Sequence, residues 1–145
     1  MKYKTASVGR VFVCRLNDGD DLLKCLEELV KQEGVKAAIF HVVGGMKGGK
    51  IVVGPETEEM PPIPVYREIT ESHEVTGMGT IFYKEGQPSV HFHGAFGKKD
   101  TVKMGCLREF SKTFIVLEAI VTELKGIDKV TRRLDPVTGI YLLDV

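Results

Sequence analysis

The sequence lacks the features that mark secreted, membrane-spanning or disulfide-stabilised proteins. It contains only three cysteines, Cys14, Cys25 and Cys106, an odd number without Cys-x-x-Cys spacing. Such a set forms no disulfide framework and is typical of a reducing cytoplasm. No apolar segment follows Met1, and no apolar run approaches the ~20 residues that a membrane-spanning helix requires. We therefore expect a cytoplasmic protein with no secretory signal and no membrane contact.

An excess of charge of either sign is also missing. Lys and Arg together number 20, and so do Asp and Glu, which gives a formal net charge of zero. A balanced chain does not generate the long-range positive field that coats nucleic acid or anionic membrane, although a local basic patch is compatible with it. The 145 residues, 43% of them hydrophobic, suffice for one domain with a buried core. We expect a single domain over residues 1–145.

One segment has clear helical periodicity. Between residues 21 and 32 the apolar side chains recur on one helical face, and Gly34 suits the position just after a helix end. We expect Asp18 or Asp20 to cap its N-terminus. The rest of the chain favours strands, which we expect at residues 4–16, 35–43, 51–53, 65–69, 74–83, 89–96, 101–107 and 113–124, with a closing strand or hairpin within 130–143.

These elements predict an α+β (mixed α/β) domain built on a mainly antiparallel sheet with one main helix. The glycine-rich segment 44–50 lacks the spacing of a phosphate-binding loop, and no helix follows it. Its glycines indicate tight turns or close backbone approach instead. The proline-rich segment 55–64 is expected to be a loop.

The most informative segment is Ser89–Phe96, which contains His91 and His93 with one residue between them. Side chains alternate between the two faces of a strand, so the two imidazoles are expected on one face and Phe92 on the other. Two adjacent imidazoles can chelate a metal ion. The alternative is a solvated pair of histidines that binds none.

A third ligand can be sought on the following strand. If Lys98-Lys99 forms a two-residue hairpin loop, His91 pairs with Cys106 and His93 with Met104, which places Cys106 on the face of both histidines. Two histidines and a cysteine are zinc ligands. Three protein ligands with one open position are typical of a catalytic or ligand-binding zinc, whereas a structural site supplies four.

Other ionisable residues are weaker candidates. Glu118 is a lone charge in an apolar strand, and Glu74 opens the strand that precedes the His91 strand in sequence. Either could support a ligand histidine or act as a general acid or base, and either could equally be an exposed surface carboxylate. His41 is expected to be a core histidine, and His73 is expected to lie exposed in a polar turn.

Six segments in one order resemble the plant-and-prokaryote-conserved (PPC) domain, in its stand-alone prokaryotic form. They are Arg15 to Leu22, Val42 to Met46, Glu74 to Thr80, His91 to His93, Gly105 to Leu107, and Glu118. The family pattern has a Gly-Gly-His-Leu segment after the paired histidines. This chain has Met104-Gly105-Cys106-Leu107 there, so cysteine stands where the family usually has its third histidine.

The resemblance implies a compact domain that assembles as a homotrimer with a His91, His93 and Cys106 metal site, zinc being the expected cofactor. The fold also looks similar to that of acetolactate decarboxylase, a zinc enzyme with paired histidines and a later third one. Plant members accompany an AT-hook, and prokaryotic members are often described as predicted DNA-binding proteins. This chain contains no Arg-Gly-Arg-Pro hook.

Three functions follow as hypotheses. The first is a trimeric, metal-binding interaction or binding module, with a small-molecule ligand possible at the metal. The second is a zinc-dependent lyase or hydrolase acting on a small carboxylate substrate, with Glu74 or Glu118 moving protons. The third is a DNA-binding regulator, which the zero net charge does not support.

Overall fold

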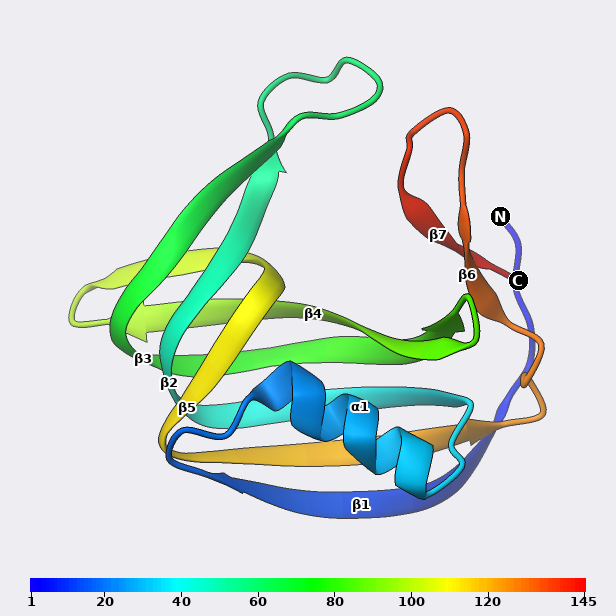
Figure 1. The fold of residues 1–145 in the computed structure, drawn as a ribbon, viewed down its shortest axis with the longest axis horizontal. Coiled ribbons are helices and arrows are strands. Elements are labelled where there is room, and N and C mark those ends of the chain that lie inside the picture. Colours follow the sequence, from blue (N-terminus) through cyan, green and yellow to red (C-terminus); the bar gives the residue numbers. More distant parts are fainter.

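Seven strands form one sheet, and a single helix packs against it (Figure 1). The computed structural model describes residues 1–145. In chain order the elements are β1 (Ser7–Asn17), α1 (Leu22–Gln32), β2 (Ala37–Pro55), β3 (Pro64–Lys84), β4 (Gln87–Lys98), β5 (Thr101–Lys125), β6 (Thr131–Leu134) and β7 (Tyr141–Asp144). Every strand pairing is antiparallel except that of β3 with β6. The predicted α+β class, the mainly antiparallel sheet and the main helix are confirmed. No helix is long and apolar enough to cross a membrane.

Three strands are longer than the sequence predicted. Segments expected to be separate strands run together in β2, β3 and β5, which have 19, 21 and 25 residues. In β2 the join is the glycine segment, where a Cβ atom on Gly44 or Gly45 would lie 2.4 Å from the Val116 carbonyl oxygen or 2.5 Å from that of Phe114. Glycine there lets β2 bend while its backbone stays close to β5. The expectation of close backbone approach is confirmed, and the expectation of a tight turn between two strands is wrong.

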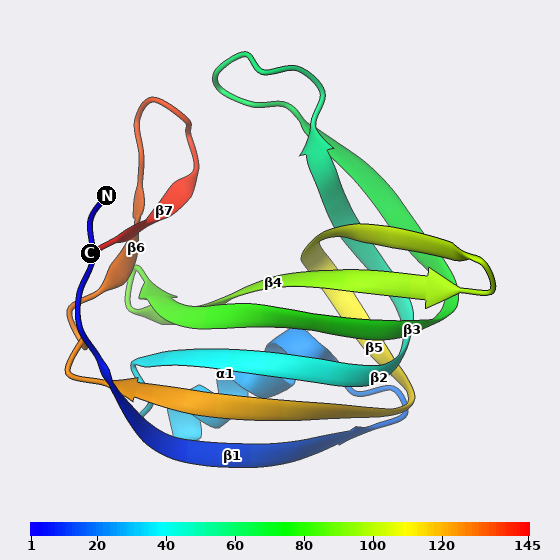
Figure 2. The same ribbon diagram turned by 180° about the vertical axis from the view of Figure 1, so that it is seen from behind.

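The bent strands close part of the sheet on itself. The sheet order is β1-β5-β2-β3-β6-β7, and β4 pairs with both β3 and β5. Strands β2, β3, β4 and β5 therefore form a ring, which is visible from behind in Figure 2. Strand β5 changes partner along its length. Its first residues pair with the second half of β4, and the rest of the strand pairs with β2.

Helix α1 covers the inner face of this sheet. Asp21 is its N-cap and accepts a hydrogen bond from the Lys24 amide, so the expected cap at Asp18 or Asp20 is wrong. The Asp21 carboxylate also accepts bonds from the Ser111 amide and hydroxyl, which ties the start of the helix to β5. Gly34 follows the helix with φ of +67°, as expected of a residue after a helix end.

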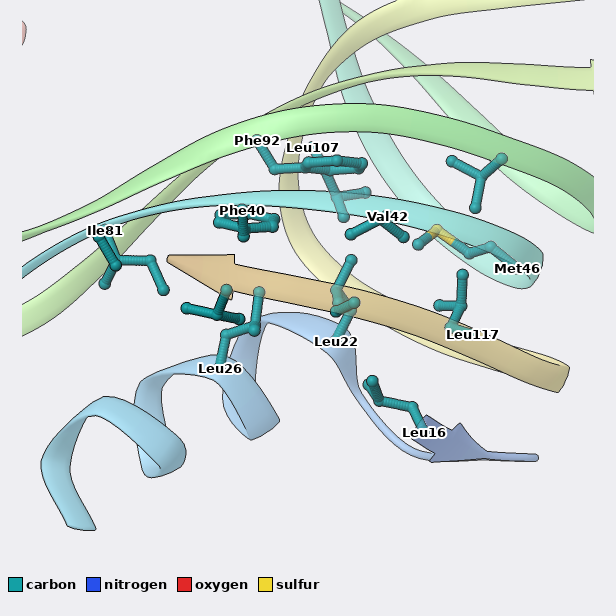
Figure 3. Close-up of a cluster of buried hydrophobic side chains, with 14 of the residues drawn as sticks. Leu16, Leu22, Leu26, Phe40, Val42, Met46, Ile81, Phe92, Leu107 and Leu117 are labelled. Carbon is teal, nitrogen blue, oxygen red and sulfur yellow. The ribbon is translucent and has the colours of Figure 1, made fainter. Parts of the chain in front are cut away.

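The main core lies between α1 and the inner face (Figure 3). Leu22 and Leu26 of the helix are buried against it. Phe40 of β2 and Phe92 of β4 are both fully buried, and their rings stack with centroids 5.6 Å apart. The pair joins the first part of β2 to the strand that carries the paired histidines.

The opposite face of the sheet, which we call the outer face, carries exposed apolar side chains that no other element covers. One cross-strand row on it joins Val13, Ile120, His41 and Met78 through the pairings of β1, β5, β2 and β3. Val13 is 82% exposed, Met78 54% and Ile120 39%. These apolar side chains alternate along their strands with core residues and therefore point away from the helix.

Replacing Phe92 with Ala should lower the free energy of unfolding by about 3–5 kcal/mol, because it removes a fully buried ring and leaves a cavity behind β4. Urea unfolding of the metal-free protein measures the change. Phe110→Ala is the matched control, since Phe110 is 48% exposed, and it should cost less than about 1 kcal/mol. Equal losses in the two variants would contradict the packing described.

Candidate metal centre

Strand β4 directs both predicted histidines to the outer face. Phe92 and Phe96 of the same strand have no exposed surface and belong to the main core. Their burial fixes the side-chain alternation of β4, so that His91 and His93 project together on the other side. The His91 and His93 Nε2 atoms lie 3.0 Å apart, and the rings meet edge to face with centroids at 4.9 Å.

Cys106 lies beside them, in a register that differs from the predicted one. His93 pairs with Cys106 and Lys98 with Thr101, so the hairpin loop is Lys99-Asp100. The predicted pairing of His91 with Cys106 is wrong by two residues, and Ala95 instead of His93 faces Met104. Because side chains alternate with a period of two, a shift of two residues leaves Cys106 on the same face.

The three side chains form a group whose donor atoms suit a zinc ion. One Nε2 or Nδ1 atom from each histidine and the Cys106 Sγ atom all lie within 4.8 Å of one another. Ligands at the usual zinc distances of ~2.0–2.3 Å lie roughly 3.3–3.6 Å apart around a tetrahedral ion. The group is therefore slightly more open than a closed site and requires side-chain adjustments of about an ångström or less. His93 is exposed, His91 half-buried and Cys106 buried.

The surroundings favour the neutral form of the His91 imidazole and the protonated form of the Cys106 thiol. Burial, followed by the charge of Arg132, lowers the pKa of His91 to about 4, so His91 is neutral at pH 7 and can donate a lone pair. Burial raises the pKa of the Cys106 thiol, while Arg108 and Arg132 act in the opposite direction. A metal binding here would therefore displace the thiol proton.

Two cavities adjoin the group. One of about 790 Å³ is lined by His93, Cys106 and apolar residues of the segment around Pro55 and Pro64. The other, of about 580 Å³, is lined by His91 and by residues of β3, β6 and β7. Arg108 and Ile140 line both cavities. In Figures 1 and 2 the hairpin of β6 and β7 and the loop between β2 and β3 both rise on the same side of β4, with the hairpin over one end of that strand.

The structure does not bring the two candidate carboxylates to this group. Glu74 is exposed on β3 and pairs with Gly97, four residues along β4 from His93. At 3.3–3.4 Å per residue this is a separation of about 13 Å. Glu118 is exposed on β5 between Arg15 and Val43 and lines neither cavity.

The remaining histidines differ from expectation. His41 is exposed on the outer face, where a core position was expected. His73 is 8% exposed and bonds the Glu71 carbonyl oxygen through Nδ1, where an exposed turn was expected. His41 alternates with the buried Phe40 and Val42 and therefore points to the other face, and His73 lies within the continuous strand β3, where a turn was expected.

Arg108 and Arg132 are the functional candidates that sequence reasoning missed. Both line cavities beside the paired histidines, yet they lie 15 and 39 residues beyond His93. Only the pairing of β6 with β3 brings Arg132 near His91, and no local motif marks it. Two adjacent arginines, Arg132-Arg133, in a short apolar tail were the available signal.

The protein is a mainly antiparallel α+β domain with a His-His-Cys group on the outer face of its sheet. The family model of the Plants and Prokaryotes Conserved (PCC) domain matches residues 3–125, and the chain belongs to this family. No curated protein matches the sequence.

Solved structures agree with this assignment. A metal-containing protein from Archaeoglobus fulgidus is 30% identical, with a TM-score of 0.87 and full coverage of both chains. A plant- and prokaryote-conserved (PPC) protein from Pyrococcus horikoshii is 28% identical, with a TM-score of 0.85 over 100% of this chain and 98% of that one. A protein from Ralstonia eutropha, provisionally named as DNA-binding, is 22% identical, with a TM-score of 0.77 over 92% and 90%, and it shows the fold alone.

The depressed pKa of His91 should be visible in the metal-free protein. An NMR titration of its ring protons should give a midpoint near 4, against about 6.5 in an unfolded chain. Between these values the unfolded chain binds more protons than the folded one, so the free energy of unfolding falls as pH drops from about 6.5 to 4. His91→Asn should reduce that pH dependence. A His91 midpoint near 6.5 would contradict the environment described.

Proposed function

We propose that this protein is a zinc-binding PPC-domain module that holds its ion through His91, His93 and Cys106. The observation that carries the proposal is the convergence of three zinc-type donor atoms within 4.8 Å. The metal-containing relative from Archaeoglobus fulgidus supports it. Three protein ligands would leave one position open, and the adjoining cavities offer room for a small molecule there. The bound ion would supply Lewis acidity for holding such a ligand.

We further propose that residues 1–145 act as one domain that assembles into a homotrimer through the outer face. The exposed apolar row through Val13, Ile120 and Met78 continues, by strand pairing, to His93 and then Cys106. Exposed apolar surface of this kind typically marks a protein–protein interface. A second copy that packs on this row would lie next to His93 and Cys106, so assembly and metal binding would share one surface.

The enzymatic alternative, a zinc-dependent lyase or hydrolase acting on a small carboxylate, has one observation in its favour. The cavity beside His93 and Cys106 is large enough for a small substrate. Proton transfer needs a group within hydrogen-bond reach of the reacting atom, and Glu74 and Glu118 lie outside both cavities. A binding module is therefore the better-supported function.

The DNA-binding alternative has less support in this chain. Lys98, one of two lysines at the β4–β5 turn, forms an ion pair with Glu71. The net charge is zero, and affinity for duplex DNA depends on uncompensated positive charge at phosphates.

Metal analysis of the purified protein tests the zinc site. Protein prepared without chelator should contain close to one zinc per chain, and His91→Ala and Cys106→Ala should each lose at least ten-fold in zinc affinity, because each removes one of three ligands. Mass spectrometry of the elemental content and a competition titration with a chromogenic chelator measure both effects.

Cys14→Ala and Cys25→Ala are the matched controls, since both cysteines are free and lie outside the group. Their zinc content should equal that of the wild type. Wild-type protein without stoichiometric transition metal would overturn the metal proposal. Unchanged zinc affinity in Cys106→Ala would overturn the role of the third ligand alone.

Sedimentation velocity tests the trimer. The wild type should sediment at three times the 16.1 kDa chain mass. Val43→Glu, which places a charge on the outer face at a 55% exposed position, should shift the protein to the monomer mass. Val137→Glu, at a 70% exposed position between β6 and β7, should leave the trimer intact. A wild type that sediments as a monomer would rule the assembly out.

A further inference from the structure

The C-terminal hairpin of β6 and β7 lies beyond the residues that match the family, which end at residue 125. It is anchored near His91, because β6 pairs with the end of β3 through Tyr83 with Thr131 and Lys84 with Arg132. Just before it, Ile127 and Val130 pack with Phe82 in a second buried cluster. The segment that carries Arg132 is therefore held in place by the body of the sheet.

Arg132 reaches from this hairpin to the strand position next to His91. Its Nη2 atom donates a hydrogen bond of 2.8 Å to the Thr80 hydroxyl, and Thr80 is the cross-strand partner of His91. Partners of this kind have Cβ atoms about 4.5–5.5 Å apart on one face. The Arg132 guanidinium is thus fixed beside the imidazole of His91, with the cavity of about 580 Å³ in front of both.

The hydrogen-bonding capacity of Arg132 is incompletely used. Its Nε atom is buried and has no hydrogen-bond partner. A buried charged donor without a partner costs more free energy than a buried neutral one, so such groups in proteins are ordinarily paired. The Nε atom is enclosed by protein, and the one side-chain hydrogen bond of Arg132 runs from Nη2 to Thr80, so the donors left for a ligand are those of Nη1 and the second proton of Nη2 at the end of the guanidinium.

The charges around this cavity are uncompensated. Lys84, Arg108 and Arg132 line it together with His91, and no Asp or Glu does. None of the six ion pairs in the structure involves any of these three cations. Lys84 instead lies over the Tyr141 ring, with Nζ 3.6 Å from the centroid. In a chain of zero net charge, a cavity with three cations and no anion is shaped to receive a negatively charged ligand.

We propose that this cavity is a binding site for a small carboxylate, held by the guanidinium of Arg132 and steered by Arg108 and Lys84. The planar end of an arginine, which presents both Nη atoms, matches the two oxygens of a carboxylate in a bidentate pair. The cavity reaches His91, so the remainder of the ligand extends toward the metal group. That last step rests on the proposed zinc site, whereas recognition of the anion by the arginines does not.

NMR titration of the metal-free protein with acetate tests the site directly. Acetate should shift the guanidinium resonances of Arg132, and acetamide, which has nearly the same shape without the charge, should not. Arg132→Gln should weaken acetate binding at least ten-fold, and Arg132→Lys should weaken it less. Arg133→Gln is the matched control, because Arg133 is 73% exposed and pairs with Asp144, and it should bind acetate within two-fold of the wild type.

Several outcomes would overturn the proposal. Equal shifts with acetate and acetamide would show that charge is not recognised, and unchanged binding in both Arg132→Gln and Arg132→Lys would remove Arg132 from the site. Inorganic phosphate that displaces acetate and binds at least ten-fold more tightly would assign the cavity to a phosphate instead of a carboxylate.

A repeat titration with zinc present separates this proposal from the proposed function. Tighter acetate binding in the zinc-loaded protein, together with loss of that gain in His91→Ala, would support a ligand that spans both sites. Acetate binding in a protein that takes up no zinc would support the anion site while refuting the metal function. Zinc uptake without acetate binding in either form would refute the anion site alone.

Discussion

Burial of Phe92 and Phe96 is the constraint on which the candidate site depends. Both rings lie fully inside the core, and Phe92 stacks on Phe40 of the neighbouring β2. A slip of β4 by one residue would expose both rings and bury His91 and His93, at a cost of several kcal/mol from lost apolar burial alone. The hydrophobic core thus determines which way the imidazoles point, and the same pairing brings Cys106 beside His93.

The site occupies the boundary between two different surfaces. On one side the outer face carries exposed apolar side chains such as Val13 and Met78. On the other side lies a cavity with uncompensated positive charge, provided mainly by Arg108 and Arg132. The same arginines help to keep His91 neutral. One arrangement therefore keeps His91 in the neutral form that can bind a metal ion and surrounds the neighbouring cavity with positive charge.

Sequence reasoning predicted the grouping of these three side chains more successfully than it predicted the strands around them. Strand alternation placed His91, His93 and Cys106 on one face even though the assumed register was wrong by two residues, because an even shift preserves the face. The conformation at Gly44 and Gly45 was harder to predict, because glycine occurs both in turns and in bent strands. The close approach of β5 carbonyl oxygens, which shows that the strand continues here, is visible only in the structure. Arg132 could not be predicted at all, because its position depends on a parallel pairing between β3 and a four-residue strand.

The central claim is that a zinc ion is bound by two histidines and one cysteine. X-ray absorption at the zinc edge tests it most directly on protein purified without chelator. The account predicts nitrogen neighbours at about 2.0–2.1 Å and one sulfur at about 2.3 Å, with the sulfur absent in Cys106→Ala and present in Cys14→Ala. A zinc environment of nitrogen and oxygen alone in the wild type, or more than one sulfur, would contradict the claim.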